Sequence, residues 1–203
     1  MYRIIFATGN AGKMKEIREI LSDLGAEILS MKEAGIRADI VEDGNTFEEN
    51  ALIKAKAVAA LLPEGSNTAV LADDSGLEID YLDGEPGIYS ARYMGEDTSY
   101  RIKNANLIQR LAGVPVEKRT ARFVCAIAAA FPDGSTVIRR GVIEGKIGYE
   151  ERGENGFGYD PIFYLPDMSR TTAELSPEEK NSISHRGRAL QAVKEDLAER
   201  MKE

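Results

Sequence analysis

Cysteine, histidine and tryptophan are nearly missing from this chain of 203 residues, and each shortage excludes a class of protein. The sequence has one Cys, one His and no Trp. A single cysteine excludes an intramolecular disulfide framework and is typical of a reducing compartment, so we expect a cytoplasmic protein. Because Cys125 lies in an apolar run, we expect it to be a buried core thiol. With His185 as the only histidine, a zinc site of the His/Cys type is excluded as well.

Long apolar stretches and an excess of positive charge are also lacking. No segment is apolar for long enough to span a bilayer, and the first residues lack a signal-peptide pattern, so we expect no membrane partner. The formal net charge of −8 argues against binding to a nucleic-acid backbone, which needs a basic surface. A phosphate ligand would therefore need cations that are gathered locally, inside particular motifs.

The hydrophobic fraction of 43% is ordinary for a packed core, and the length favours one domain, residues 1–203. Apolar periodicity predicts strands at residues 2–7, 26–31, 68–72, 120–131, 136–143 and 145–151. It predicts helices at residues 13–24, 46–62 and 99–111, after Ser176, and from His185 onward. Helices alternate with strands in the first half, and antiparallel strands dominate the second. We expect a mixed α/β fold, with helices flanking a central sheet and two lobes that enclose a nucleotide cleft.

The first predicted strand runs into a small-residue loop, Thr8 to Lys13 (TGNAGK), which precedes a helix. A helix N-terminus offers N–H groups and a partial positive charge to an anion. Gly9 and Gly12 allow a ligand to approach the backbone closely, and Lys13 adds a full charge. The loop lacks the G-x-x-x-x-G-K-[ST] pattern of a P-loop, and taken alone it is equally compatible with a plain strand–turn–helix connection.

Asp73 and Asp74 follow the strand predicted at residues 68–72, at the end where α/β sheets bind ligands. Because successive strand side chains alternate between faces, only one of the two carboxylates should face the site. We favour Asp74, which lies nearer the Ser75-Gly76 turn; a turn capped by these side chains is the structural alternative. Mg²⁺ needs only one or two carboxylates plus substrate phosphates, so Asp74 and Glu42 would suffice as ligands. Which of the two aspartates binds the metal directly stays open.

Cations and aromatics recur at the ends of the predicted elements. The candidate cations are Lys13, Lys54, Lys180, His185 and Arg186. Gly158 lies between Phe157 and Tyr159, which allows a ring to stack on a nucleobase, although a core aromatic corner is the alternative. A hydrolase triad is discounted, because the sequence has no G-x-S-x-G elbow.

Six short motifs occur in order along nearly the whole chain. They are residues 8–13 (TGNAGK), 46–55 (TFEENALIKA), 72–77 (ADDSGL), 87–93 (GIYSARY), 157–163 (FGYDPIF) and 184–187 (SHRG). Together they strongly resemble the inosine triphosphate pyrophosphatase family, also described as noncanonical purine nucleoside triphosphate (dITP/XTP) pyrophosphatases. Each motif is modest, but the six in order are specific.

The resemblance implies a homodimer that hydrolyses ITP, dITP and XTP to the monophosphate and pyrophosphate with Mg²⁺. Such an enzyme cleanses the nucleotide pool and prevents incorporation of these nucleotides into DNA and RNA. It implies that the triphosphate is held by Thr8, Gly9, Asn10, Ala11, Gly12 and Lys13, with Lys54 helping to balance phosphate charge. It implies that Asp74 is the catalytic acid/base and a metal ligand, and that Glu42 is a second metal contact. It implies nucleotide binding by Ser75, Phe157, Gly158, Tyr159, Asp160, Lys180, His185 and Arg186.

Base choice would follow from hydrogen bonding. Hypoxanthine and xanthine present a 6-oxo acceptor, which His185 and Arg186 would satisfy, whereas the 6-amino group of adenine would oppose these donors. Sites built on such bonds discriminate by about 10⁴–10⁵. Guanine also carries a 6-oxo group, so its exclusion must involve the 2-position.

Three other functions remain open from the sequence. The first is a pyrophosphatase for modified pyrimidines or for standard triphosphates. The second is a nucleotide-binding regulatory module without turnover, which would not need Asp74. The third is a nucleic-acid-binding protein, which the acidic balance opposes.

Overall fold

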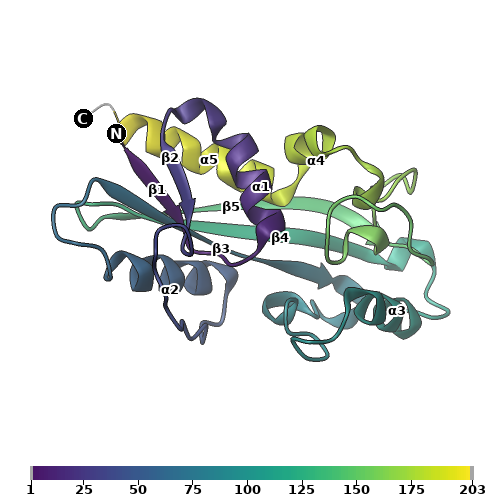
Figure 1. Ribbon diagram of the computed structural model, residues 1–203. Helices are drawn as coiled ribbons and strands as arrows, with labels where there is room; N and C mark the ends of the chain where they lie inside the picture. The colour runs from purple at the N-terminus through teal and green to yellow at the C-terminus, as the bar shows by residue number, and fades with distance from the viewer. Residues whose placement is uncertain (1, 202–203) are drawn as a thin grey trace. The chain divides into compact units, whose positions relative to one another are not determined.

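A mixed six-stranded sheet forms the centre of the computed structural model, which describes residues 2–201 (Figure 1). The strand order is β2-β1-β3-β4-β5-β6. The strands are β1 (Arg3–Phe6), β2 (Glu27–Ser30), β3 (Thr68–Ile79), β4 (Thr120–Ala130), β5 (Thr136–Ile147) and β6 (Phe163–Tyr164). Strand β1 runs parallel to β2 and β3, whereas β5 and β6 are antiparallel. The predicted fold class, a mixed α/β sheet with flanking helices, is confirmed.

Capping side chains mark the starts of several helices. The helices are α1 (Ala11–Ile20), α2 (Phe47–Ala59), α3 (Tyr100–Arg110), α4 (Pro177–Ile183) and α5 (His185–Arg200). Ser99 caps α3, and Ser176 opens α4 with a complete capping box and Pro177 in the first turn. Over residues 2–201, no helix combines the length and apolar character needed to cross a membrane.

The chain divides into two compact units. The first comprises the described residues up to Asp74, residues 125–141 and those from Arg186 onward; the second comprises Ser75–Val124 and Val142–His185. Strands β3, β4 and β5 each contribute residues to both units.

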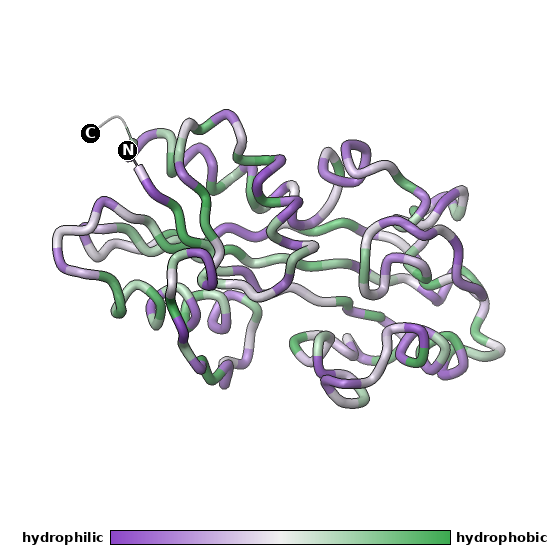
Figure 2. Tube along the Cα trace, viewed as in Figure 1, coloured by the Kyte–Doolittle hydropathy of each residue, from purple (hydrophilic) through white to green (hydrophobic). Residues whose placement is uncertain are grey.

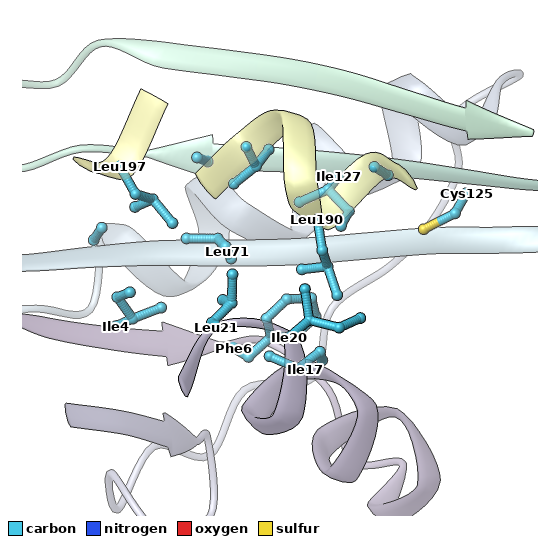
Figure 3. Close-up of a cluster of buried hydrophobic side chains, with 14 of the residues drawn as sticks. Ile4, Phe6, Ile17, Ile20, Leu21, Leu71, Cys125, Ile127, Leu190 and Leu197 are labelled. Carbon is cyan, nitrogen blue, oxygen red and sulfur yellow. The ribbon is translucent and has the colours of Figure 1, made fainter. Parts of the chain in front are cut away.

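In the first unit, α1 and α5 pack on one face of the sheet strands. Figure 3 shows Phe6 of β1 beside Ile17 of α1, with Ile4 of β1 and Leu190 and Leu197 of α5 in the same cluster. Each large side chain buried in this way stabilises the fold by about 1.5–3 kcal/mol. Cys125 is buried among them, as predicted, and burial raises the pKa of its thiol to about 12, so it has little thiolate character.

The second unit has a core of its own, built between α3 and the parts of β3, β4 and β5 that belong to this unit. Leu77 and Ile79 of β3 pack with Leu107 of α3 and with Phe123 of β4. Phe123 in turn stacks on Phe163, with ring centroids 4.1 Å apart. In Figure 2 the hydrophobic colouring follows the strands, and the helices carry mixed colouring that fits one buried and one exposed face.

Several predicted boundaries were wrong. Helix α1 spans Ala11–Ile20 instead of residues 13–24, and a separate 3₁₀ turn, Ser22–Leu24, follows it. The third strand continues to Ile79 instead of ending at Ala72, since buried Leu77 and Ile79 keep the alternation going beyond the acidic pair. The strands predicted at residues 136–143 and 145–151 are one strand, β5. Helix α2 ends at Ala59, three residues before the predicted Leu62. The short strand β6, inside the aromatic motif, was not predicted.

Candidate active site

The loop after β1 leads into the N-terminus of α1. Asn10 caps α1 by accepting a hydrogen bond from the backbone N–H of Lys13 at 3.1 Å, and its own N–H donates to Thr8 Oγ1 at 3.1 Å. A Cβ atom added to Gly9 would meet no atom within 4 Å, so the backbone is open there. The helix N-terminus predicted from the sequence is therefore present, with its first turn beginning at Ala11.

The acidic pair lies on β3 just beyond the end of β1. The register pairs Phe6, the last residue of β1, with Leu71, so Asp73 and Asp74 extend past their parallel neighbour. The prediction that they lie at the carboxyl end of their own strand was wrong, because β3 continues to Ile79. They lie instead just beyond the carboxyl end of β1, the shorter parallel neighbour of β3. This placement brings them to the same side of the sheet edge as the loop that follows β1.

Asp73 is a buried ion-pair centre. Its Oδ2 lies 2.8 Å from Lys13 Nζ and 3.5 Å from Arg186 Nη2, and its side chain is 1% exposed. Burial alone would raise the pKa of Asp73, but Lys13 and Arg186 outweigh it and hold that pKa well below its usual range. Arg186 also bonds Glu16, with 2.6 Å between Nη1 and Oε2. Asp73 therefore stays ionised and fixes Lys13, in the first turn of α1.

Asp74 has a different environment from its neighbour. Its Oδ2 accepts a hydrogen bond from Asn50 Nδ2 at 3.2 Å, and the residue is 9% exposed. Burial raises the pKa of Asp74 to about 6 against the opposing effects of Lys54 and Asn50, and the negative charges of Glu42 and Asp73 add to the increase. The two adjacent carboxylates thus have pKa values pushed in opposite directions, as expected for groups with different tasks.

Asn50 is a residue whose importance the sequence reasoning missed. Besides bonding Asp74, its Oδ1 accepts from the backbone N–H of Gly44 at 2.9 Å. The amide therefore ties the loop that carries Glu42 to the catalytic candidate Asp74. The signal was present in the sequence, since Asn50 lies one helical turn before Lys54 on α2 and therefore on the same face.

Glu42 and Asp74 form a donor set that fits Mg²⁺. Glu42 Oε2 lies 3.1 Å from Lys54 Nζ, and the charge of Glu42 is felt at Asp74. Among residues 2–201, no group of three or more His, Cys, Asp or Glu side chains gathers as a complete metal cage. Two carboxylates are sufficient for Mg²⁺, which takes its remaining ligands from water and substrate phosphates.

In the second unit, Asp160 organises the loop of residues 157–160, called the aromatic loop below. Asp160 Oδ2 accepts from the Phe157 N–H at 2.9 Å and lies 2.8 Å from Lys180 Nζ, while its Oδ1 accepts from Thr172 Oγ1 at 2.7 Å. Asp160 and Lys180 are both buried, but Phe157 is partly exposed. The Lys180 ammonium lies 4.8 Å from the Phe157 ring centroid, a cation–π contact that orients the ring.

His185 is buried as the first residue of α5. Its ring stacks on Phe123, with centroids 4.9 Å apart and the planes inclined by 24°. Ser75, the first residue of the second unit, is partly exposed. Within the first unit, Lys13 and Arg186 are both ion-paired with Asp73. Lys54 is ion-paired with Glu42, and both charges lie close enough to Asp74 to shift its pKa. Within the second unit the structure gathers the 157–160 loop with Lys180, and it places His185 against Phe123 rather than in that group.

The fold and these charged groups define a mixed α/β protein with a lysine in the first turn of its first helix and a buried pair of carboxylates in unlike environments. The chain belongs to the Ham1 family, whose model matches residues 4–196. It is 50% identical to the dITP/XTP pyrophosphatase of Exiguobacterium sibiricum, with 96% of each chain covered. It is 49% identical to the dITP/XTP pyrophosphatase of Caldanaerobacter subterraneus over 100% of both chains. The family resemblance read from the six motifs is confirmed.

Solved structures agree with this assignment. The Ham1 protein of Staphylococcus aureus superposes with a TM-score of 0.83 at 42% identity, over 96% of this chain and 97% of that one. A nucleoside-triphosphatase / dITP/XTP pyrophosphatase from Mycobacterium abscessus gives a TM-score of 0.72 at 40% identity, over 94% and 98%.

Proposed function

We propose that this protein hydrolyses noncanonical purine nucleoside triphosphates, namely ITP, dITP and XTP, to the nucleoside monophosphate and pyrophosphate. One observation carries the proposal: Asp74, with its raised pKa, follows directly on Asp73, which is ion-paired to Lys13 of the anion-binding loop. The proposed proton acceptor, Asp74, is thereby adjacent in sequence to the carboxylate that holds Lys13, a proposed phosphate-binding residue. The names of the relatives, dITP/XTP pyrophosphatases at about half identity, support the choice of substrate.

The first unit would bind the triphosphate. The segment Thr8, Gly9, Asn10, Ala11 and Gly12 at the start of α1 would donate hydrogen bonds to phosphate oxygens, and Lys13 and Lys54 would balance the phosphate charge. Because phosphoryl-transfer catalysis consists mainly of positioning and charge stabilisation, these groups would supply most of the rate enhancement. Asp73 has a supporting part, since it holds the Lys13 ammonium in place before the substrate arrives.

Asp74 would accept the proton of the attacking water. With a pKa of about 6 it is mostly ionised at neutral pH, yet it is a stronger base than an ordinary aspartate. Asn50 orients the carboxylate through its amide. Glu42 and Asp74 would hold Mg²⁺, which when bound would neutralise charge on the triphosphate.

The second unit would bind the base. The partly exposed ring of Phe157 is suited to stack on a purine, and Asp160 with Lys180 would hold the loop of Phe157, Gly158 and Tyr159 in shape. Ser75 and His185 would complete the nucleotide contacts on this unit.

Arg186 belongs to the first unit and is 2% exposed between Glu16 and Asp73. To bond a 6-oxo oxygen, as we propose, Arg186 would direct one of the five N–H donors of its guanidinium to the substrate.

Three further expectations accompany this function. We propose that the whole chain, residues 1–203, acts as one domain, that two copies form a homodimer, and that the protein works in the cytoplasm. They rest on the family resemblance and on the lone buried cysteine. Sedimentation equilibrium of the purified protein at micromolar concentration measures the dimer directly.

Product analysis tests the function. The protein is incubated with Mg²⁺ and ITP, dITP, XTP, GTP or ATP, and pyrophosphate is scored separately from orthophosphate. We expect pyrophosphate from the first three nucleotides, and its loss in Asp74→Asn but not in Asp39→Asn, an exposed aspartate of the same unit. Binding without turnover would instead identify a regulatory module, and release of orthophosphate alone would contradict the proposed reaction.

A further inference from the structure

Helix α3 buries two polar side chains that the proposed reaction does not use. Lys103 and Asn104 are each 1% exposed. Lys103 Nζ donates to the carbonyl of Ala91 at 2.7 Å, within the 87–93 motif. Asn104 Nδ2 donates to the carbonyl of Gly158 at 3.3 Å and to Glu151 Oε1 at 2.9 Å. Because burying an amide is unfavourable unless it is bonded, these two acceptors fix the orientation of the Asn104 side chain.

The carbonyl that Asn104 holds lies in the middle of the aromatic loop. Gly158 has a φ of +66°, in the left-handed region, and a Cβ atom there would lie 3.6 Å from Tyr100 Cε1. Glycine adopts several backbone conformations at similar free energy, so the sequence alone does not fix the plane of the peptide that follows Gly158. A donor from outside the loop can therefore decide which way this carbonyl points.

The residues on either side of Gly158 are anchored independently. The Phe157 N–H donates to Asp160, and the Tyr159 hydroxyl donates to the carbonyl of Ser90. The Tyr159 ring also packs edge-on against Tyr100, with centroids 5.1 Å apart. Between these two anchors, Asn104 supplies the side-chain contact to the Gly158 carbonyl.

We propose that Asn104 is a positioning residue for base recognition, which sets the Gly158 peptide and thereby presents the Phe157 ring to the purine. The inference rests on the proposed function and adds a specificity role for α3. It predicts that loss of the Asn104 amide weakens binding of the base but leaves binding of the triphosphate intact, because Lys13, Lys54 and the loop after β1 belong to the other unit.

The test compares three variants. Asn104→Asp keeps the shape but replaces the donor with a carboxylate facing two acceptors, and Asn104→Ala removes the group. Gln109→Ala is the matched control, an exposed amide on the same helix. The KM and kcat for ITP are measured with Mg²⁺, together with competitive inhibition by inorganic tripolyphosphate, which has no base.

We expect both Asn104 variants to raise the KM for ITP about tenfold, the equivalent of one net hydrogen bond at the upper end of its range. The inhibition constant for tripolyphosphate should change less than about twofold, as should every value for Gln109→Ala. An unchanged KM for ITP would overturn the inference, and so would an equal loss of affinity for ITP and tripolyphosphate, which indicates general loss of structure. A wild-type protein that releases no pyrophosphate from ITP would overturn the proposed function itself, a result that is distinguishable because it needs no variant.

Discussion

Replacing Asp74 by asparagine should make the protein more stable at pH 8, although it removes the proposed base. The folded protein holds the pKa of Asp74 at about 6, against an ordinary value of 3.8. A carboxyl whose pKa is raised by folding destabilises the folded state at every pH where it is ionised. A difference of about two pH units corresponds to about 3 kcal/mol. Asn50 can still donate to an asparagine oxygen at this position, so the hydrogen bond is kept.

The sign of the effect depends on pH. Above pH 6 the full cost of the ionised Asp74 is present, and it declines as the pH falls from 6 through 3.8, below which folded and unfolded chains are both protonated. We therefore expect Asp74→Asn to raise the free energy of unfolding by up to about 3 kcal/mol at pH 8 and by less than about 1 kcal/mol at pH 4. For a chain of this length, that corresponds to an increase in Tm of up to about 6–12 °C.

Asp73→Asn is the matched control, since it changes the adjacent carboxylate in the same way. Asp73 is paired with Lys13 and Arg186, and removing one partner of a buried ion pair typically destabilises by about 3–5 kcal/mol. Thermal and urea unfolding of the metal-free proteins, with a chelator present, measure both changes. If Asp74→Asn is neutral or destabilising at pH 8, or if both variants shift stability in the same direction, the assignment of the two environments is wrong.

Three further predictions concern activity. Lys13→Ala should lower kcat/KM for ITP by at least about 100-fold, because it removes a charge proposed to bind phosphate. Lys15 is exposed on the same helix, and Lys15→Ala should leave kcat/KM unchanged. Similar values for the two variants would contradict the phosphate role of Lys13. Arg186→Ala should reduce the ratio of kcat/KM for ITP over ATP by at least about tenfold, with Arg188→Ala as the exposed control, and an unchanged ratio would remove Arg186 from base recognition. Wild-type kcat/KM for ITP should fall at acid pH, because protonated Asp74 cannot accept a proton. Since a bound cation lowers the pKa of a carboxylate ligand, the fall at saturating Mg²⁺ should lie below the metal-free value of about 6, and a flat profile from pH 4 to 8 would exclude Asp74 as the base.

Local chemistry predicted much of the fold. Caps such as Ser99 and Ser176 act within a few residues, so the starts of α3 and α4 could be located from the sequence. At α2 the same logic was only half right. The sequence from Thr46 to Glu49 is a capping-box pattern, and Thr46 does accept from the Glu49 N–H, but the Glu49 carboxylate bonds the N–H of Asn45 instead of that of Thr46. The choice between two adjacent N–H groups depends on the path of the preceding loop, which no local pattern shows.

Other features depend on partners that are distant in sequence. Asp73-Asp74 reads as the end of a strand, yet β3 continues to Ile79, where buried side chains extend the alternation. The pKa of Asp73 is lowered by Lys13 and by Arg186, which lies more than 100 residues away in the sequence. The pKa of Asp74 is raised by burial, against the opposing effects of Lys54 and Asn50. Alternation along a strand predicted that the two carboxylates would differ, but only the tertiary contacts show which one is fully ion-paired.

The central claim is that Asp74 directs water to the innermost phosphorus of the triphosphate. Hydrolysis of ITP in ¹⁸O-enriched water, with Mg²⁺ and mass spectrometry of both products, tests it most directly. The account predicts one ¹⁸O atom in the inosine monophosphate and none in the pyrophosphate. Label in the pyrophosphate, or in released orthophosphate, would show attack at another phosphorus and contradict the account.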